Sequence, residues 1–325
     1  MKAVFLGTPA FAVPSLTALI DAGHEVAMVV TQPDRPTGRG GRIEMPPVKT
    51  VALKHGLNVI QPEKLRRAEW VEQLRGLHAD VFITAAYGQI LSKRLLDIPR
   101  LGTVNVHASL LPRYRGSAPV QWALINGEQH TGVTTMLTDV GVDTGDVLMQ
   151  RSTPIQLEET ADTLLERLSH IGAELLIETL SRLERGECPR VQQDPGQASY
   201  FPMLTKEDGL INWALPAQSI INHTRGVDPW PGAFTFSPNG VLKIYKVCEI
   251  NYTNYSQKGV MLDPGRVLVS DPKRGLIIAC GELTALEIME LKPPSGKQMT
   301  AAAYLRGHPL DVGKLLENVP NGGIQ

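Results

Sequence analysis

Short apolar runs alternate with amphipathic segments along the first 106 residues of the chain. The runs are rich in Val, Ile, Leu and Phe, which predicts buried strands, and the segments repeat apolar residues at helical spacing. The expected strands are residues 2–6, 24–30, 57–60, 80–85 and 102–106. The expected helices are residues 10–21, 48–54, 68–77 and 91–97. Alternation of this kind is typical of βαβ units and indicates a Rossmann-like α/β domain with a mostly parallel sheet.

Further elements complete this first domain, which we expect to span residues 1–187. They are a helix at 118–126, extended segments at 132–137 and 147–155, and a long helix at 160–185. The last segment repeats Leu and Ile at helical spacing over its whole length, which predicts one face packed on the sheet.

The remaining sequence predicts a different architecture. Residues 188–205 are polar and contain three prolines, which predicts a linker. A short helix at 216–225 precedes short strands separated by turn residues, a pattern typical of a small β-barrel. These strands are expected at 233–236, 241–247, 266–269, 275–280 and 285–291. We therefore expect a second, all-β domain over residues 206–325, which could either bind a substrate or only support the first domain.

Composition and charge narrow the possible functions. The 325 residues are 42% hydrophobic and 20% charged, which predicts a packed globular chain. The formal net charge of -1 does not indicate a general nucleic-acid binder, so any RNA contact must come from a local basic patch. Cys188, Cys248 and Cys280 lie far apart, so neither a disulfide framework nor a zinc site is expected. Without a long apolar run or a leader-like start, we expect a cytoplasmic protein with no membrane partner.

The first turn of the chain lacks the features of a dinucleotide site. It has a single Gly7 followed by Thr8-Pro9, instead of Gly-x-Gly-x-x-Gly. The second strand ends at Thr31-Gln32, where an acidic residue would be needed to bind a ribose hydroxyl. We therefore expect this fold to work without NAD.

Polar residues gather at the end of the fifth expected strand. Asn105 and His107 are two residues apart, so in extended chain their side chains point to the same face. Open α/β sheets bind ligands at the carboxyl ends of their strands. Asp139, Asp143 and Asp146 follow in a glycine-containing turn, and one of them could reach the histidine. A single histidine at a strand end is more often structural, so this pair alone is a weak signal.

Two loops carry further candidates. Residues 109–116 combine the apolar pair Leu110-Leu111 with Arg113 and Arg115, and could line a pocket for a flat ligand with acidic groups. Residues 32–47 are rich in Pro, Gly and Arg without periodicity, which predicts a mobile surface loop.

Three arginines are spaced along the loop 32–47: Arg35, Arg39 and Arg42. They could be solvated, or they could form an arm that meets RNA phosphates and orders on binding. Composition alone leaves both readings open.

One long motif resembles the 10-formyltetrahydrofolate-dependent formyltransferases. It reads Asn105-x-His107-x-Ser109-Leu110-Leu111-Pro112-x-x-Arg115-Gly116, with Asp143 in an Asp-x-Gly-x-Asp-x-Gly-Asp run. The resemblance covers nearly the whole chain and is strongest to the members that formylate the amino group of methionyl initiator tRNA. It implies that the second domain is an OB-like barrel, that 10-formyltetrahydrofolate is the co-substrate, and that the tRNA is the partner. We expect a monomer.

The resemblance also assigns roles to residues. It implies that Asn105, His107 and Asp143 are catalytic. The positions that it places around the folate are Ser109, Leu110, Leu111, Pro112, Tyr87, Gly88 and Ile90, although on sequence alone Tyr87 is as consistent with packing. The arginine loop is similar to the tRNA-contacting insertion of these enzymes, so Arg35, Arg39 and Arg42 would bind tRNA, with Arg39 the strongest candidate.

Formyl transfer is acyl transfer and needs a donor for the developing oxyanion and a route for protons. Asn105 can donate without titrating, His107 can donate when protonated, and Asp143 can hold the histidine tautomer and accept a proton through water. Ser109 lacks the Gly-x-Ser-x-Gly elbow of a hydrolase nucleophile, and no metal-ligand spacing is visible.

Two other functions remain open at this point. A formyltransferase for a small amine, such as an amino-sugar nucleotide or glycinamide ribonucleotide, would share the catalytic trio, and the arginine loop is the feature that discriminates against it. A non-catalytic RNA- or nucleotide-binding protein is disfavoured because Asn105, His107 and Asp143 occur together.

Overall fold

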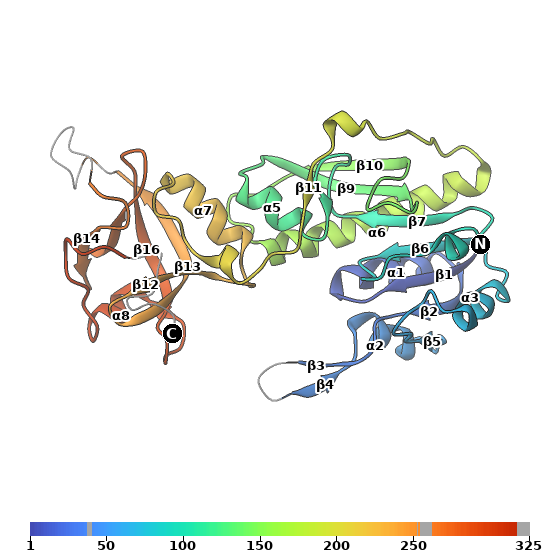
Figure 1. Cartoon of the computed structure of the whole chain (residues 1–325), viewed down its shortest axis with the longest axis horizontal. Helices are drawn as coiled ribbons and strands as arrows, with labels where there is room; N and C mark the ends of the chain where they lie inside the picture. The colour runs from blue at the N-terminus through green and yellow to red at the C-terminus, as the bar shows by residue number, and fades with distance from the viewer. Residues whose placement is uncertain (38–40, 252, 254–261, 317–325) are drawn as a thin grey trace. The chain divides into compact units, whose positions relative to one another are not determined.

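The computed structural model describes residues 1–37, 41–251, 253 and 262–316 (Figure 1). The chain forms two compact units. Unit 1 comprises Met1–Val120, His130–Pro154 and Thr163–Pro202. Unit 2 comprises Gln121–Gln129, Ile155–Asp162 and Met203–Gln325.

Unit 1 is built on a seven-stranded sheet with the order β10-β9-β7-β6-β1-β2-β5. Its strands are β1 (Lys2–Gly7), β2 (Glu25–Val30), β5 (Val59–Ile60), β6 (Val81–Ala85), β7 (Thr103–His107), β9 (His130–Leu137) and β10 (Val147–Pro154). The five strands from β5 to β7 pair in parallel, whereas β9 is antiparallel to β7 and β10 to β9. The mostly parallel Rossmann-like sheet is therefore confirmed, with an antiparallel edge.

Helices lie between these strands along the chain, and one follows the last of them. They are α1 (Val13–Asp21) after the 3₁₀ turn η1 (Ala10–Ala12), α2 (Pro47–Lys54), α3 (Ala68–Arg75), α4 (Lys93–Leu96), α5 (Pro119–Ile125) and α6 (Ala161–Arg185). Helix α6 runs along the sheet (Figure 1), and Gly172 lets it approach closely. A Cβ at Gly172 would lie 2.8 Å from a methyl carbon of Val106 on β7, so only glycine fits there.

The burial of the central strands explains why the sequence reads as continuous apolar runs. Val4, Phe5 and Leu6 of β1 and Phe82 and Ile83 of β6 have no exposed surface. In a strand that is buried on both faces, polar and apolar residues do not alternate along the sequence. Each such side chain contributes about 1.5–3 kcal/mol on transfer from water, which is why these strands hold the sheet together.

The arginine loop has more regular structure than expected. The prediction that residues 32–47 contain no regular element was wrong, because β3 (Arg35–Thr37) and β4 (Arg42–Glu44) pair as an antiparallel ladder. The hairpin extends away from the sheet of unit 1 (Figure 1). Strands of three residues are too short to show a hydrophobic period, and the side chains of Arg35, Pro36, Ile43 and Glu44 are all exposed.

The segment expected to be a linker also carries structure. Its 3₁₀ turn η2 spans Pro195–Gln197, and β11 (Tyr200–Phe201) pairs in parallel with β8 (Arg115–Gly116). The rings of Tyr114 and Phe201 stack with centroids 4.7 Å apart. Residues 191–202, which we call the strap, thus lie on the loop that follows β7. The division of the chain into a domain 1–187, a linker 188–205 and a domain 206–325 stays a prediction.

Unit 2 contains an antiparallel sheet with the order β12-β13-β16-β15-β14, and β17 pairs with β16. The strands are β12 (Ala233–Ser237), β13 (Gly240–Ile250), β14 (Val267–Asp271), β15 (Gly275–Ala279), β16 (Ala285–Lys292) and β17 (Met299–Thr300). Helix α7 spans Ala217–Gly226, and η3 spans Glu207–Gly209. This arrangement confirms the second, all-β part of the fold class.

Two features of unit 2 were not expected from the sequence. Trp213 is buried, and its Nε1 donates to the Oγ1 of Thr235 on β12 at 3.0 Å. Helix α8 (Ala301–Leu305) follows Thr300, whose Oγ1 accepts a hydrogen bond from the main-chain nitrogen of Ala303. Thr300 before three alanines is the N-cap signal that could have predicted this helix.

Candidate active site

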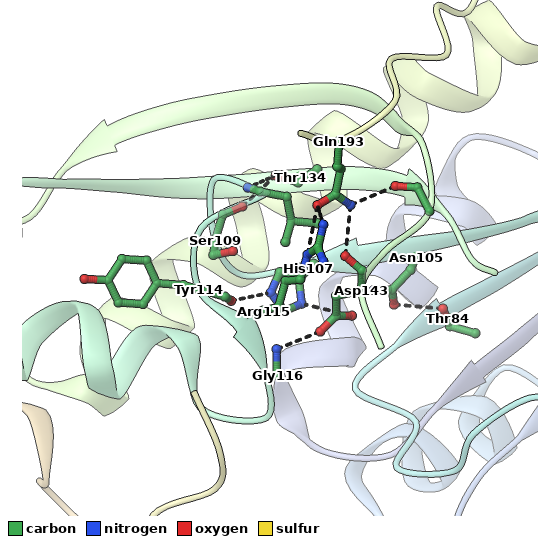
Figure 2. A network of polar contacts seen from close by, with 12 residues as sticks. Thr84, Asn105, His107, Ser109, Tyr114, Arg115, Gly116, Thr134, Asp143 and Gln193 are labelled. Atoms are coloured by element: carbon green, nitrogen blue, oxygen red, sulfur yellow. Dashed lines mark hydrogen bonds and ion pairs between the residues drawn. The ribbon is translucent and has the colours of Figure 1, made fainter. Parts of the chain in front are cut away.

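Asn105 lies on β7 next to Thr84 of the parallel strand β6. The buried Thr84 hydroxyl donates to Asn105 Oδ1 at 2.8 Å (Figure 2). Among the described residues, no hydrogen bond engages Asn105 Nδ2. The amide therefore keeps its donor end available, because Thr84 occupies its acceptor end.

His107 follows two residues later on the same strand and is 8% exposed. Its Nε2 lies 3.0 Å from the main-chain oxygen of Tyr114, which can only accept, so Nε2 carries a proton. Its Nδ1 lies 3.7 Å from Asp143 Oδ1. The ring nitrogen that can exchange a proton in the site is therefore Nδ1, on the side of the aspartate (Figure 2).

Asp143 lies in the turn between β9 and β10, with φ of 53°. Aspartate tolerates this left-handed backbone better than most residues. Its Oδ2 accepts a hydrogen bond from the main-chain nitrogen of Gly116 at 2.8 Å. Asp139, one of the two alternatives left open by the sequence, lies differently, since it is exposed and accepts from Thr144 Oγ1 at 2.6 Å within its own turn. Only Asp143 is recorded beside His107 among the described carboxylates.

The loop after β7 is held by a hydrogen-bond chain that starts on β9. Thr134 Oγ1 donates to the main-chain oxygen of Ser109 at 2.6 Å and accepts from the main-chain nitrogen of Leu111 at 3.2 Å. Ser109 is 1% exposed, and its hydroxyl donates to the main-chain oxygen of Arg113 at 2.9 Å. Gln150 Nε2 donates to the main-chain oxygen of Leu111 at 2.7 Å. These bonds explain how Ser109 and Leu111 fix the loop.

The predicted folate residues therefore fall into buried and accessible groups. Ser109 and Leu111 are buried, whereas Leu110 and Pro112 are partly exposed. Their contact with folate stays a prediction.

Three more predicted folate residues follow β6. Tyr87 is 4% exposed and packs in a core cluster with Val4, Leu6 and Phe82, which is the packing role that the sequence allowed. Burial raises the pKa of its phenol above the ordinary value. Gly88 is exposed, with φ of 87°, and Ile90 is 77% exposed. Gly88 and Ile90 thus remain available for a ligand, and their role stays a prediction.

Two of the three predicted RNA-binding arginines lie on the β3–β4 hairpin. Arg35 is exposed on β3, Arg42 lies on β4, and Arg39 lies outside the described residues. Their binding of tRNA stays a prediction.

A polar cluster anchors the base of this hairpin. Lys49 Nζ lies 2.6 Å from both Asp34 Oδ2 and Gln61 Oε1, and Gln61 Nε2 donates to Asp34 Oδ1 at 2.7 Å. These bonds lower the pKa of Asp34, so its carboxylate stays charged and paired with Lys49.

Sequence reasoning missed three residues of this region: Thr84, Thr134 and Gln193. Thr84 and Thr134 sit in strands, where a threonine is unremarkable. Gln193 lies in the strap, and nothing in its local sequence distinguishes it from the neighbouring Gln192. Their roles depend on neighbours that only the folded sheet provides.

The described residues form neither a metal-binding cluster nor a membrane-spanning helix. No cluster of three or more His, Cys, Asp or Glu is placed to hold a metal ion. No described helix is long and apolar enough to cross a membrane.

Comparison with known proteins gives consistent matches over both parts of the chain. The model of a family described as formyl transferase matches residues 1–180, and the formyl transferase C-terminal domain matches residues 203–309. The chain is 51% identical to the methionyl-tRNA formyltransferase of Citrifermentans bemidjiense, over 97% of this chain and 96% of that protein. It is 48% identical to that of Ruminiclostridium cellulolyticum, over 97% and 99% of the two chains.

Solved structures share the fold at lower identity. An N-formyltransferase from Helicobacter canadensis, in complex with folinic acid and dTDP-3-aminofucose, superposes with a TM-score of 0.65 at 19% identity. That match covers 89% of this chain and 98% of the other. HypX from Aquifex aeolicus, in complex with tetrahydrofolic acid, has a TM-score of 0.61 at 17% identity, and this chain spans about half of its length, 47%. Since the first family model covers more than half of the sequence and the curated relatives match it almost from end to end, the chain belongs to the formyl transferase family.

Proposed function

We propose that this protein transfers the formyl group of 10-formyltetrahydrofolate to the amino group of methionyl initiator tRNA, which yields N-formylmethionyl-tRNA. The observation that carries the proposal is the identity of 48–51% to methionyl-tRNA formyltransferases over 97% of the chain. The protein would act in the cytoplasm, where aminoacylated tRNA enters translation.

The side chains at the end of β7 fit the chemistry of this reaction. The folate co-substrate supplies an activated formyl group, and the tRNA supplies the attacking amine. Asn105 Nδ2 is oriented by Thr84 to donate a hydrogen bond to the formyl oxygen, where negative charge develops. A fixed donor of this kind lowers a barrier by about 3 kcal/mol, on the order of a hundredfold or more in rate.

Proton transfer falls to the other two members of the trio. His107 Nδ1 can exchange a proton, because Nε2 is already committed to the main-chain oxygen of Tyr114. Asp143 Oδ1, 3.7 Å from Nδ1, would receive through water the proton that the attacking amine loses, and a protonated His107 Nδ1 would give a proton to the folate nitrogen as its bond to the formyl carbon breaks. The side chains of His107 and Asp143 are only 9% and 17% exposed, which limits access of bulk water to this exchange.

The folate would bind against the loop 109–112 and the segment after β6. The partly exposed Leu110 and Pro112 offer apolar surface for a flat ring, and Gly88 and Ile90 are accessible. Ser109 and Leu111 would hold the loop from inside, since their polar groups are bonded to Arg113 and Thr134.

The tRNA specificity would depend on the β3–β4 hairpin. Arg35, Arg39 and Arg42 would contact phosphates, and the cluster of Asp34, Lys49 and Gln61 would fix where the hairpin leaves the sheet. We further propose that residues 1–187 form the catalytic domain and residues 206–325 a second domain.

The test uses the purified protein with 10-formyltetrahydrofolate and three acceptors in parallel: methionyl initiator tRNA, methionyl elongator tRNA and a panel of small amines that includes an amino-sugar nucleotide. We expect efficient transfer to the initiator tRNA only. Transfer to a small amine without any response to tRNA would overturn the assigned acceptor, while keeping the formyl-transfer chemistry.

A further inference from the structure

Gln193 in the strap is a buried amide with all of its hydrogen-bonding capacity used. It is 6% exposed. Its Nε2 donates to the main-chain oxygens of Asp143 at 2.9 Å and Gly145 at 2.8 Å. Its Oε1 accepts from Arg115 Nε at 3.1 Å and Nη2 at 2.8 Å. Burying an amide is costly unless its groups are satisfied, so this side chain has one well-defined position.

These bonds connect two segments that each touch the candidate site. Asp143 and Gly145 belong to the turn between β9 and β10, and Arg115 belongs to β8 in the loop after β7. Figure 2 shows Gln193 between them, with the Asp143 carboxylate pointing back toward His107 and Gly116. Asp143 is therefore held twice, through its main-chain oxygen by Gln193 and through its carboxylate by the Gly116 nitrogen at 2.8 Å.

The turn needs such a support. Its outer residues Val140, Gly141 and Val142 are exposed, so little packing holds it from that side. Asp143 itself has a left-handed backbone, which a free turn would leave for more favourable conformations. The Gln193 bonds hold the main chain of this turn to Arg115 on β8.

We propose that Gln193 is a positioning residue for formyl transfer, which ties the Asp143 turn to Arg115 and thereby keeps the Asp143 carboxylate beside His107. The inference rests on the proposed function and extends it to a residue outside the signature motif. Because a misplacement of about 1 Å can cost on the order of a hundredfold in rate, the effect belongs to turnover more than to binding.

The first variant is Gln193→Met, which has a similar length, no hydrogen-bond donor and only a weak acceptor. We expect kcat to fall at least about tenfold, with the KM of the donor and of the tRNA within about twofold of wild type. The exposed neighbour Gln192→Met is the matched control, and it should retain wild-type kinetics. The wild-type assay itself separates the two proposals, since an inactive wild type would count against the function and not against the positioning.

A second comparison separates positioning from general stabilisation. In an Asp143→Ala background, Gln193→Met should change kcat by less than about twofold, because the group that it positions is absent. An equal loss in both backgrounds, or a folded Gln193→Met enzyme with wild-type kcat, would overturn the proposal. If Gln193→Met does not fold, as judged by circular dichroism, Gln193→Glu takes its place under the same criteria, because it keeps the acceptor for Arg115 and loses the donors to the turn.

Discussion

The orientation of the Asn105 amide decides what this site offers to a substrate. An asparagine presents either an acceptor or a donor, and Thr84 Oγ1 at 2.8 Å takes the acceptor. The choice is made on a neighbouring strand, 21 residues earlier in the chain. The orientation of Asn105, which belongs to the motif, is therefore fixed by Thr84, which lies outside the motif.

Replacing Asn105 with Asp tests this donor directly. The carboxylate keeps the shape and can still accept from Thr84, but it has no N–H to offer the formyl oxygen. We expect kcat to fall on the order of a hundredfold or more with little change in KM, measured by steady-state formylation kinetics. Retention of wild-type kcat by a folded Asn105→Asp enzyme would show that Asn105 is not the donor.

Gly116 links the motif to the strap and tolerates no side chain. Its φ is 106°, and a Cβ would lie 2.3 Å from the main-chain oxygen of Phe201. We expect Gly116→Ala to destabilise the protein by roughly 2–5 kcal/mol, because the strap must move away and the left-handed strain remains. Denaturant unfolding measures this change.

Gly186 provides the control for that substitution. It also has a positive φ, 73°, but a Cβ there meets nothing within 4 Å. Gly186→Ala should therefore cost only the backbone strain, about 1–2 kcal/mol. Equal destabilisation of the two variants would mean that the strap relaxes freely around the added methyl group at Gly116.

The strap shows how an element without regular pattern can complete a site. Its strand β11 has two residues, and Ser199 adds a side-chain bond in which its Oγ accepts from the main-chain nitrogen of Tyr114 at 2.9 Å. Tyr114 in turn supplies the oxygen that holds His107. The imidazole is therefore fixed by a loop that the strap keeps in place.

Helix α7 carries His223, and we expect this histidine to make the stability of unit 2 depend on pH. His223 Nε2 donates to the main-chain oxygen of Asp208 at 2.6 Å, and burial lowers the pKa of His223 below its ordinary value. As pH falls through the ordinary histidine range, the unfolded chain binds the proton first, so stability present at neutral pH is lost. The decrease cannot exceed about 1.4 kcal/mol per pH unit for one proton.

His223→Gln tests this pH dependence. The Gln amide can still donate to Asp208 and does not titrate, so the variant should lose less stability than wild type between about pH 7.5 and 5.5. Thermal unfolding at several pH values gives the two slopes. Identical slopes would assign the dependence to another group, such as His24, whose pKa is also lowered by burial.

Charge over the whole molecule does not explain how an RNA would be bound. The charges of the 32 basic and 33 acidic residues nearly cancel, so the attraction for RNA must come from a local group of arginines. The β3–β4 hairpin concentrates arginines on an arm that projects from the sheet of unit 1 (Figure 1).

Replacing both Arg35 and Arg39 with Ala should therefore weaken the binding of tRNA and leave the binding of folate unchanged. We expect the KM for methionyl initiator tRNA to rise about tenfold or more, with the KM of the folate unchanged. The slope of log affinity against log salt concentration should become shallower by about one for each phosphate that an arginine no longer neutralises. The exposed Arg75→Ala on α3 is the control. An unchanged tRNA KM would remove the hairpin from tRNA recognition.

Apolar periodicity and one motif determined much about this protein. The periodicity predicted the α/β sheet, the order of its strands and helices along the chain, and the all-β second part, because buried strands show a local sequence pattern. The motif predicted the trio of Asn105, His107 and Asp143, because polar residues at the end of a strand also form a local pattern. The choice of Asp143 over Asp139 and Asp146 needed the family resemblance, and the geometry places Asp143 beside His107.

Only the tertiary structure decided how these residues are held. Thr84, Thr134 and Gln193 act on partners 21, 25 and 50 residues away in sequence, so no local window contains the interaction. The hairpin β3–β4 and the pair β8–β11 are likewise too short to show a period. Side-chain chemistry was readable from the sequence because it is a property of single residues, whereas orientation depends on contacts that exist only once distant segments have packed together.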